Sequence, residues 1–383
     1  MIKRILYTLL IMFPVLASAQ INTDRVMAIG RNALYFEDYV LSIQYFNQVI
    51  NAKPYLSDPY FYRGLAKINL DDFQGAESDC SEAIERNPFV VSAYQVRGLA
   101  RIQQNNFAGA IEDYTKALEF DPENIGVWHN MALCRIRQED YKGAKNDLDK
   151  LIAISPRYTK AYLMRGEVDL KQKDTLAAEK DFGKAIEIDR YDADTWASRA
   201  ILRLQQQRYK DAEADFDHAI RLSTRNSGVY INRALARYHQ NNLRGAMSDY
   251  DIALDIDPNN FIGHYNRGLL RAQVGDDNRA IQDFNFVIEM EPDNMMAIFN
   301  RGLLLDQTGD YKGAIKDYST VINEYPNFLL GYQYRAQARR KIGDVKGADA
   351  DEFKVLKAQL DKQNGVDPNN CLLYTSDAAD EED

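Results

Sequence analysis

Small residues recur along the chain every 34 residues. One position of this repeat holds only Gly or Ala in all ten copies: Gly30, Gly64, Gly98, Ala132, Gly166, Ala200, Ala234, Gly268, Gly302 and Ala336. Twelve residues further on, Ser42 is followed by nine alanines from Ala76 to Ala348. Small side chains at both places let two antiparallel helices cross closely. The pattern therefore predicts an all-α array of helical hairpins.

Seven prolines keep the same register: Pro54, Pro88, Pro122, Pro156, Pro258, Pro292 and Pro326. With proline at position 32 of each unit, ten units of 34 residues fill residues 23–362 without an insertion. A proline ring cannot extend a helix, so each proline is expected to end the second helix of its unit. At position 24 the last unit has Glu352, which predicts a polar cap there, and residues 363–370 are predicted to be a linker.

Aromatic residues occupy two further positions, where we expect them to fill the space between helices. Position 24 has Phe46, Tyr114, Phe182, Phe216, Tyr250, Phe284 and Tyr318, and position 4 has Tyr60, Tyr94, Trp128, Tyr162, Trp196, Tyr230 and Tyr332. A small residue at 8, Ala at 20, an aromatic at 24, Ala at 27 and Pro at 32 resemble the tetratricopeptide repeat family over residues 23–362. The resemblance implies a right-handed superhelical solenoid of ten helix-turn-helix units, with the first helices on its concave side.

Arginine and aspartate also follow the repeat. Position 7 is Arg63, Arg97, Arg165, Arg199, Arg233, Arg267, Arg301 and Arg335, and position 23 is Asp79, Asp113, Asp147, Asp181, Asp215, Asp249, Asp283, Asp317 and Asp351. A buried arginine needs an acidic partner, so a structural ladder of ion pairs is predicted, with pairing within a unit favoured over pairing with the next unit. Met131 breaks the pattern, and Arg135 is expected to substitute. A row of arginines that grips acidic ligands is the functional alternative.

An apolar stripe at positions 5, 9 and 12 runs along the first helices. By the resemblance positions 2, 5, 9, 12 and 13 face the groove, and the residues proposed to line it are Phe61, Leu65, Ile68, Leu99, Ile102, Leu133, Ile136, Ile201, Leu204, Leu235, Tyr238, Tyr265, Leu269, Phe299 and Leu303. No unit has the Lys at 5 or the Asn at 9 with which the family clamps peptide carboxyl termini. The stripe fits a groove for an extended segment or a partner helix, or the packing of neighbouring units against each other.

No pattern of catalytic or metal-binding residues accompanies the repeats. The four histidines fall in different units, and there is no phosphate-binding loop or paired cysteine motif. Cys80 and Cys134 lie two units apart and are expected to be buried thiols rather than a disulfide. The net charge of −10 includes five acids in the last thirteen residues, and no basic stripe suggests nucleic acid. We expect no enzyme, no cofactor and no nucleic-acid partner.

The amino terminus resembles a secretory signal peptide. Lys3 and Arg4 precede an apolar stretch at residues 5–16, and Ala17 and Ala19 stand three and one positions before Gln20. Residues 1–19 are therefore predicted to be cleaved off. Twelve apolar residues are too few to span a bilayer, which needs about 20. The mature chain is expected to have no membrane span and to lie in the periplasm or cell envelope of a bacterium.

The last thirteen residues, 371–383, depart from the repeat. Their sequence, CLLYTSDAADEED, resembles a reading frame through a transposon-based sequencing adapter, and a native acidic tail is the alternative. The leading functional hypothesis is a non-enzymatic scaffold that binds protein or peptide partners along the groove. A second hypothesis makes the repeats the amino-terminal sensory or anchoring region of a longer envelope protein.

Overall fold

The structure is a computed structural model, and it describes residues 22–222 and 225–363. The predicted signal peptide at 1–19 and the adapter-like tail at 371–383 lie outside the described residues, as do residues 364–370 of the predicted linker. Gln363 was assigned to that linker but belongs to the last helix. In the described residues every regular element is an α-helix, which confirms the all-α fold class.

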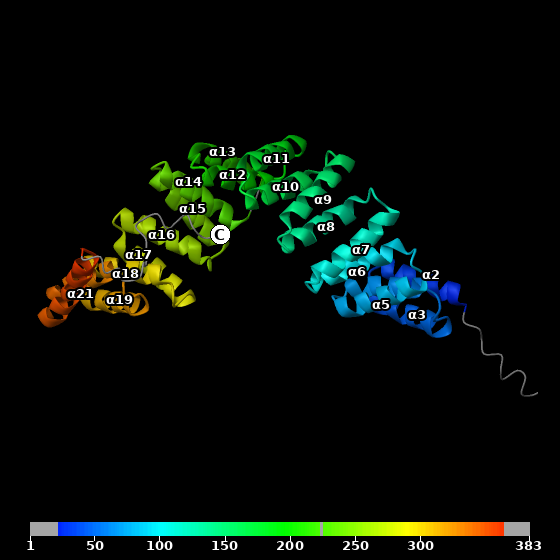
Figure 1. The fold of residues 1–383 in the computed structure, drawn as a ribbon, viewed down its shortest axis with the longest axis horizontal. Helices are drawn as coiled ribbons and strands as arrows, with labels where there is room; N and C mark the ends of the chain where they lie inside the picture. Colours follow the sequence, from blue (N-terminus) through cyan, green and yellow to red (C-terminus); the bar gives the residue numbers. More distant parts are fainter. Residues whose placement is uncertain (1–21, 223–224, 364–383) are drawn as a thin grey trace, which may run out of the picture. The chain divides into compact units, whose positions relative to one another are not determined.

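The chain divides into two compact units, residues 1–190 and 191–383, each with five of the ten repeats. In the first unit the helices are α2 Thr23–Tyr35, α3 Tyr39–Ala52, α4 Asp58–Ile68, α5 Phe73–Arg86, α6 Val91–Gln103, α7 Phe107–Phe120, α8 Ile125–Arg137, α9 Tyr141–Ile154, α10 Thr159–Lys171 and α11 Thr175–Ile188. Figure 1 colours this unit from blue to the first greens, and each helix packs against the next in the chain.

The second unit continues the same alternation of first and second helices. Its helices are α12 Ala193–Gln205, α13 Tyr209–Arg221, α14 Ser227–His239, α15 Leu243–Ile256, α16 Phe261–Gln273, α17 Asp277–Met290, α18 Met295–Thr308, α19 Tyr311–Glu324, α20 Leu329–Lys341 and α21 Val345–Gln363. Within this unit too, consecutive helices pack side by side in chain order, as Figure 1 shows. The helical hairpin predicted from the 34-residue period is therefore the unit of the fold.

The turn between the two helices of a repeat has the same backbone in every repeat. Position 15 has a positive φ in all ten, from 58° at Asn105 to 93° at Gly309. The next residue is usually Asp or Asn, whose side chain accepts a hydrogen bond from the backbone N–H three residues later, as Asn106 does from Gly109. This bond satisfies an N–H that the helix itself leaves unpaired. Turn and cap together bring the chain back antiparallel.

The crossing of the two helices needs the small residues at position 8. A Cβ added to Gly98 would lie 2.7 Å from Cε1 of Tyr114, and one added to Gly166 would lie 2.5 Å from Cε1 of Phe182. The aromatic ring at position 24 of the second helix thus packs directly on the glycine backbone of the first. Tyr114, Phe182, Phe216, Phe284 and Tyr318 are completely buried, which confirms their place in the core.

The last helix does not end the array with the polar face that Glu352 predicted. Glu352 is exposed and pairs with Arg340 of its own hairpin at 2.6 Å. The same helix, α21, also exposes Phe353, Leu356 and Leu360, so apolar side chains interrupt the predicted polar face. Arg340 forms ion pairs with Asp349 and Glu352. No described residue covers the apolar side chains of α21.

Candidate binding surface and ion-pair ladder

The arginine at position 7 lies against the aspartate of its own repeat. In eight repeats the guanidinium Nε and Nη2 both approach the carboxylate, and the shortest N–O distance is 2.5 to 2.8 Å. The aspartates are buried, while the arginines keep a partly exposed edge. The structure thus brings these eight predicted pairs together within units: Arg63–Asp79, Arg97–Asp113, Arg165–Asp181, Arg199–Asp215, Arg233–Asp249, Arg267–Asp283, Arg301–Asp317 and Arg335–Asp351.

Seven of these eight arginines also contact the preceding repeat, which was not predicted from the sequence; for Arg199 the residue at position 25 is Gly183, which has no polar side chain. The Nη1 atom donates to a polar side chain at position 25: Asn47, Ser81, Asp149, Asp217, Asp251, Asn285 or Ser319. The signal was present in the sequence, because position 25 is polar in these units. Each of these seven arginines therefore joins three helices, two in its own repeat and one in the repeat before.

An aromatic ring covers the guanidinium in many repeats. The Arg63 Cζ atom lies 5.5 Å from the centroid of Tyr60, and Arg199 lies 5.0 Å from Trp196. This stacking gives the position 4 rings a second role besides filling space. In seven repeats all three guanidinium nitrogens already have partners: Nε and Nη2 contact the aspartate of the same repeat, and Nη1 contacts position 25 of the preceding repeat. The contacts favour the structural ladder over an arginine row that binds acidic ligands.

The fourth repeat is the imperfect rung of the ladder. Met131 stands where the others have arginine, and Arg135 Nε lies 2.9 Å from Asp147 Oδ2. The contact lacks hydrogen-bond geometry, and neither atom has another hydrogen-bond partner among the described residues. Burial raises the pKa of Asp147 to about 6, and the charge of Arg135 opposes that rise only in part. Asp147 is thus a buried carboxylate whose cost of burial is only partly offset by the charge of Arg135.

The apolar stripe of the first helices is partly core and partly surface. Leu99, Ile201, Tyr238 and Leu269 are exposed, with 36–39% of their surface open to solvent. Phe61, Leu65, Ile68, Ile102, Leu133, Ile136, Leu235, Tyr265, Phe299 and Leu303 are half-buried, and all but Leu133 pack against the core clusters. Leu204 is only 9% exposed and packs among Ala200, Phe216 and Val229. Its assignment to an open groove was wrong, because it points between helices.

Three exposed residues extend the stripe in the second unit. Position 2 is Ile262, Met296 and Leu330 in the last three repeats, and all three side chains are exposed. Positions 2, 5, 9 and 12 share one side of a helix, so these residues continue the line of Leu269 and its equivalents. Position 2 was expected to face the groove, but these three residues were not among those predicted to line it. Position 2 is polar or glycine in the seven earlier repeats, which was a signal that could have singled them out.

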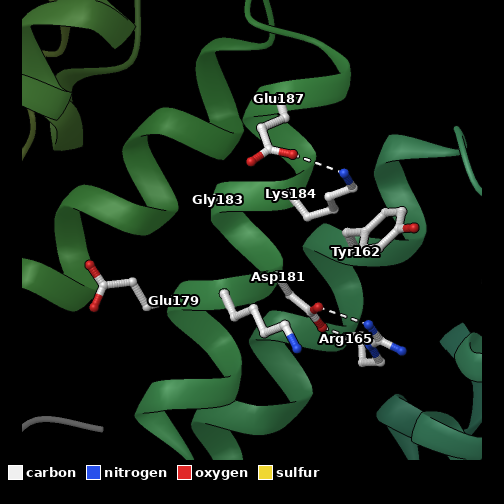
Figure 2. A pocket seen from close by; sticks show the side chains of 8 residues that line it. Tyr162, Arg165, Glu179, Asp181, Gly183, Lys184 and Glu187 are labelled. Carbon is white, nitrogen blue, oxygen red and sulfur yellow. Dashed lines mark hydrogen bonds and ion pairs between the residues drawn. The ribbon is translucent and has the colours of Figure 1, made fainter.

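A pocket of about 510 Å³ lies on the fifth repeat, between α10 and α11. Figure 2 shows Arg165 of α10 pointing to Asp181 of α11, and Lys184 pointing to Glu187 one turn along α11. Gly183 contributes no side chain to the pocket wall. Three acids and three bases line the pocket: Glu179, Asp181, Glu187, Arg165, Lys180 and Lys184. The balanced charges give it no pronounced preference for an anion or a cation.

Reactive groups do not gather anywhere in the described part of the chain. In residues 22–222 and 225–363 no three His, Cys, Asp or Glu side chains are placed to share a metal ion. Cys80 and Cys134 are free and buried, as expected, and burial raises the thiol pKa to about 12 and about 11. Such thiols are poor nucleophiles. No helix among the described residues has the length and apolarity that a bilayer crossing requires.

The family is evident from comparison with known repeats. A model described as TPR repeat matches residues 98–134, and two models described as tetratricopeptide repeat match residues 125–158 and 159–192, and 198–261 and 265–327. Together they cover more than half of the chain. The chain belongs to the tetratricopeptide repeat family, whose repeats form scaffolds for protein–protein interaction. None of the curated proteins compared with the chain matches it.

Two solved structures show the same fold. One is a tetratricopeptide repeat protein from Parabacteroides merdae, 21% identical, with a TM-score of 0.51 over 65% of this chain and 98% of that one. The other is the C-terminal part of a TPR repeat-containing protein from Cytophaga hutchinsonii, 17% identical, with a TM-score of 0.51 over 62% of this chain and 97% of that one. At these identities the likeness concerns the fold alone.

Proposed function

We propose that this protein is a non-enzymatic scaffold of the bacterial cell envelope that binds an extended or helical segment of a partner protein along its first helices. The family supports the scaffold role. The observation that carries the finer proposal is the row of exposed apolar side chains on first helices of the second unit: Ile201, Tyr238, Ile262, Leu269, Met296 and Leu330. We call these six residues the first-helix row.

The first-helix row suits an apolar segment for two reasons. Large apolar side chains repeated on successive first helices lose water when a partner covers them, and each buried side chain contributes about 1.5–3 kcal/mol before the costs of binding. The row also lacks the Lys and Asn pattern of the family's carboxylate clamp, so side chains rather than a chain terminus are the expected point of recognition.

The row is tested with a surface variant and a matched control. Leu269→Ser and Met296→Ser together remove two members of the row, and Ile252→Ser changes an exposed residue on the second helix α15. A photoreactive residue placed at Tyr238 identifies the partner in envelope extracts of the source bacterium, and binding is then measured with the purified partner segment. We expect binding to weaken at least about tenfold in the row variant and to stay unchanged in the control. Equal binding by both variants would contradict the proposal.

The envelope location rests on the amino-terminal sequence and needs its own test. The full-length gene is expressed in a bacterium, and the protein is recovered from the periplasmic and cytoplasmic fractions. Mass spectrometry of the periplasmic protein is expected to give Gln20 as the first residue, because Ala17 and Ala19 fit the signal peptidase site. Recovery of only uncleaved cytoplasmic protein would refute export without affecting the binding proposal.

A further inference from the structure

The first and last helices of the array each have one side that faces no described repeat. Inside the array, the first helix of a repeat uses positions 4, 7, 11 and 14 to contact the second helix of the repeat before. For example, Tyr60 donates to the carbonyl of Pro54, Arg63 to Asn47, and Arg101 and Gln104 to Glu77. These contacts are polar, and they recur as Tyr162 to Pro156, Arg233 to Asp217 and Gln240 to Glu213.

In α2 and its carboxy-terminal cap residue the same four positions are apolar. They are Val26, Ile29, Ala33 and Phe36, which we call the amino-terminal face. Ile29 is 38% exposed and Phe36 is 77% exposed. The outer face of a terminal repeat is expected to be polar when it is exposed to solvent. Here the arginine, the glutamine and the aromatic hydroxyl of the inner repeats have all been replaced by side chains that make no hydrogen bond.

The opposite end of the array has the matching change. In inner repeats, position 17 offers its carbonyl to the next repeat, position 25 offers a polar side chain and position 32 a proline carbonyl. In α21 these positions are Val345, Phe353 and Leu360, and Leu356 stands at position 28. All four are exposed, and we call them the carboxy-terminal face. Position 28 is apolar in the third repeat too, where Leu118 packs against a core cluster that includes Val127 and Met131 of the next repeat.

The two faces are complementary when they are paired in the register of the inner repeats. Position 7 meets position 25 there, so Ile29 would meet Phe353. By the same register Phe36 would meet Val345. Leu360 falls outside this register, because α21 continues to Gln363 whereas the inner second helices end before position 32. The contacts of positions 7 and 14 would thus become apolar on both partners, while Ala33 at position 11 would meet Asp349 at position 21. The acid at position 21, Asp349, has Arg340 as its partner at 2.9 Å, so no uncompensated charge would be buried.

We infer that copies of this chain associate head to tail, with the amino-terminal face of one copy covering the carboxy-terminal face of the next. The contact continues the repeat-to-repeat packing from one molecule into another. Because its two halves differ, it is a heterologous interface that leaves a free face at each end of the assembly. Association therefore proceeds beyond the dimer as concentration rises. This inference is independent of the proposed partner-binding role, which uses a different side of the first helices.

The test uses one variant for each face. The amino-face variant has Ile29→Glu and Phe36→Glu, and the carboxy-face variant has Phe353→Glu and Leu356→Glu. Since all four side chains are exposed, both variants are expected to fold, which circular dichroism and melting curves check. Leu176→Glu is the matched control, because Leu176 is 80% exposed on α11 and belongs to neither face. Molar mass is measured by sedimentation over a wide range of protein concentrations.

The expected results distinguish this interface from any other. The wild type and the control reach molar masses above twice the monomer, and each face variant associates at least about tenfold more weakly. An equimolar mixture of the two variants forms dimers and nothing larger, since one intact face of each kind remains. A wild type that stays monomeric overturns the inference, as does a mixture that forms no dimers or a face variant that associates like the wild type. Association that appears only after deletion of residues 364–383 would assign the carboxy-terminal face to that segment and also overturn it.

Discussion

Arg301 donates two hydrogen bonds to Asp317 of its own repeat, from Nε to Oδ2 at 2.8 Å and from Nη2 to Oδ1 at 2.7 Å. This rung has no second base at position 11, where the chain has Leu305. Most other rungs do, and Asp249 contacts Arg237 at 2.8 Å as well as Arg233. Arg301 and Asp317 are therefore the pair in which the coupling of arginine and aspartate is measured most directly.

Asp317→Ala is expected to destabilise the fold by about 3 kcal/mol, which is the lower end of the range for removing one partner of a buried ion pair. The lower end applies because the Arg301 side chain is 22% exposed and water reaches it. Adding Arg301→Leu removes the stranded charge and should recover about half of the loss. Urea denaturation of the two single variants and the double variant gives the coupling energy. Additive losses would show that the two residues do not act as a pair.

The incomplete rung at Asp147 predicts an unusual pH dependence. Its folded pKa of about 6 exceeds the value of about 4 in unfolded chains, so the folded state binds more protons between these pH values. This carboxyl therefore favours folding at low pH, and its contribution is lost as pH rises from about 4 to 6. By linkage the loss is about 3 kcal/mol. Asp147→Asn should remove it, and the stability gain over the wild type should grow over that pH range.

A second substitution separates this effect from simple loss of an acid. Met131→Arg supplies the arginine that the other rungs have, and Asp147 should then ionise at lower pH. The stability of this variant relative to the wild type should also rise between pH 4 and 6, although the carboxyl is still present. A stability difference that does not change with pH in either variant would mean that Asp147 is not the titrating group.

Two neighbours on α12 are expected to respond differently to the same substitution. Leu204→Ser should cost about 2–5 kcal/mol, because the side chain is buried among core residues and its loss leaves a cavity. Ile201→Ser should cost less than about 1 kcal/mol, since that side chain is exposed. Melting curves of the two variants make the comparison. A large loss at both positions would show that Ile201 also seals the helices.

The positive φ at position 15 predicts that glycine is stabilising there. Lys173 has φ 62°, a left-handed conformation that costs a non-glycine residue about 1 kcal/mol. Lys173→Gly should therefore stabilise the protein by about 0.5–1 kcal/mol in thermal unfolding. Gly309→Ala, at the same position with φ 93°, is the reverse change and should destabilise it. Opposite signs in the two variants are the expected result, and equal signs would refute the argument.

Removal of residues 371–383 is expected to leave the melting temperature unchanged. The last described helix, α21, ends at Gln363, and the helices described up to there supply their own caps and core. The measurement is a melting curve of the shortened chain beside that of the full chain. A drop of more than a few degrees would show that the acidic segment packs on the fold, and would favour a native tail over an adapter.

Much of the fold was predictable because it depends on contacts within one hairpin. Gly166 and Phe182 are sixteen residues apart, and their sizes have to match whatever the neighbouring repeats do. Arg165 and Asp181 have the same separation, and a buried charge requires a partner within reach. Repetition of these pairs every 34 residues determined the helix boundaries, the crossing and the ladder. The right-handed superhelix implied by the resemblance stays a prediction.

Only the tertiary structure decided which apolar side chains meet solvent. Ile201 and Leu204 are both apolar and lie one turn apart on the same stripe, yet one is exposed and the other is core. Burial there depends on the tilt and spacing of neighbouring helices, which no single repeat encodes. The contact of Arg165 with Asp149 in the preceding repeat also follows from packing between repeats, and Phe353 on α21 is exposed because no described repeat packs against it. The sequence by itself determined the hairpin, because its contacts are local and periodic, while the surfaces available for binding were decided by the way the hairpins stack.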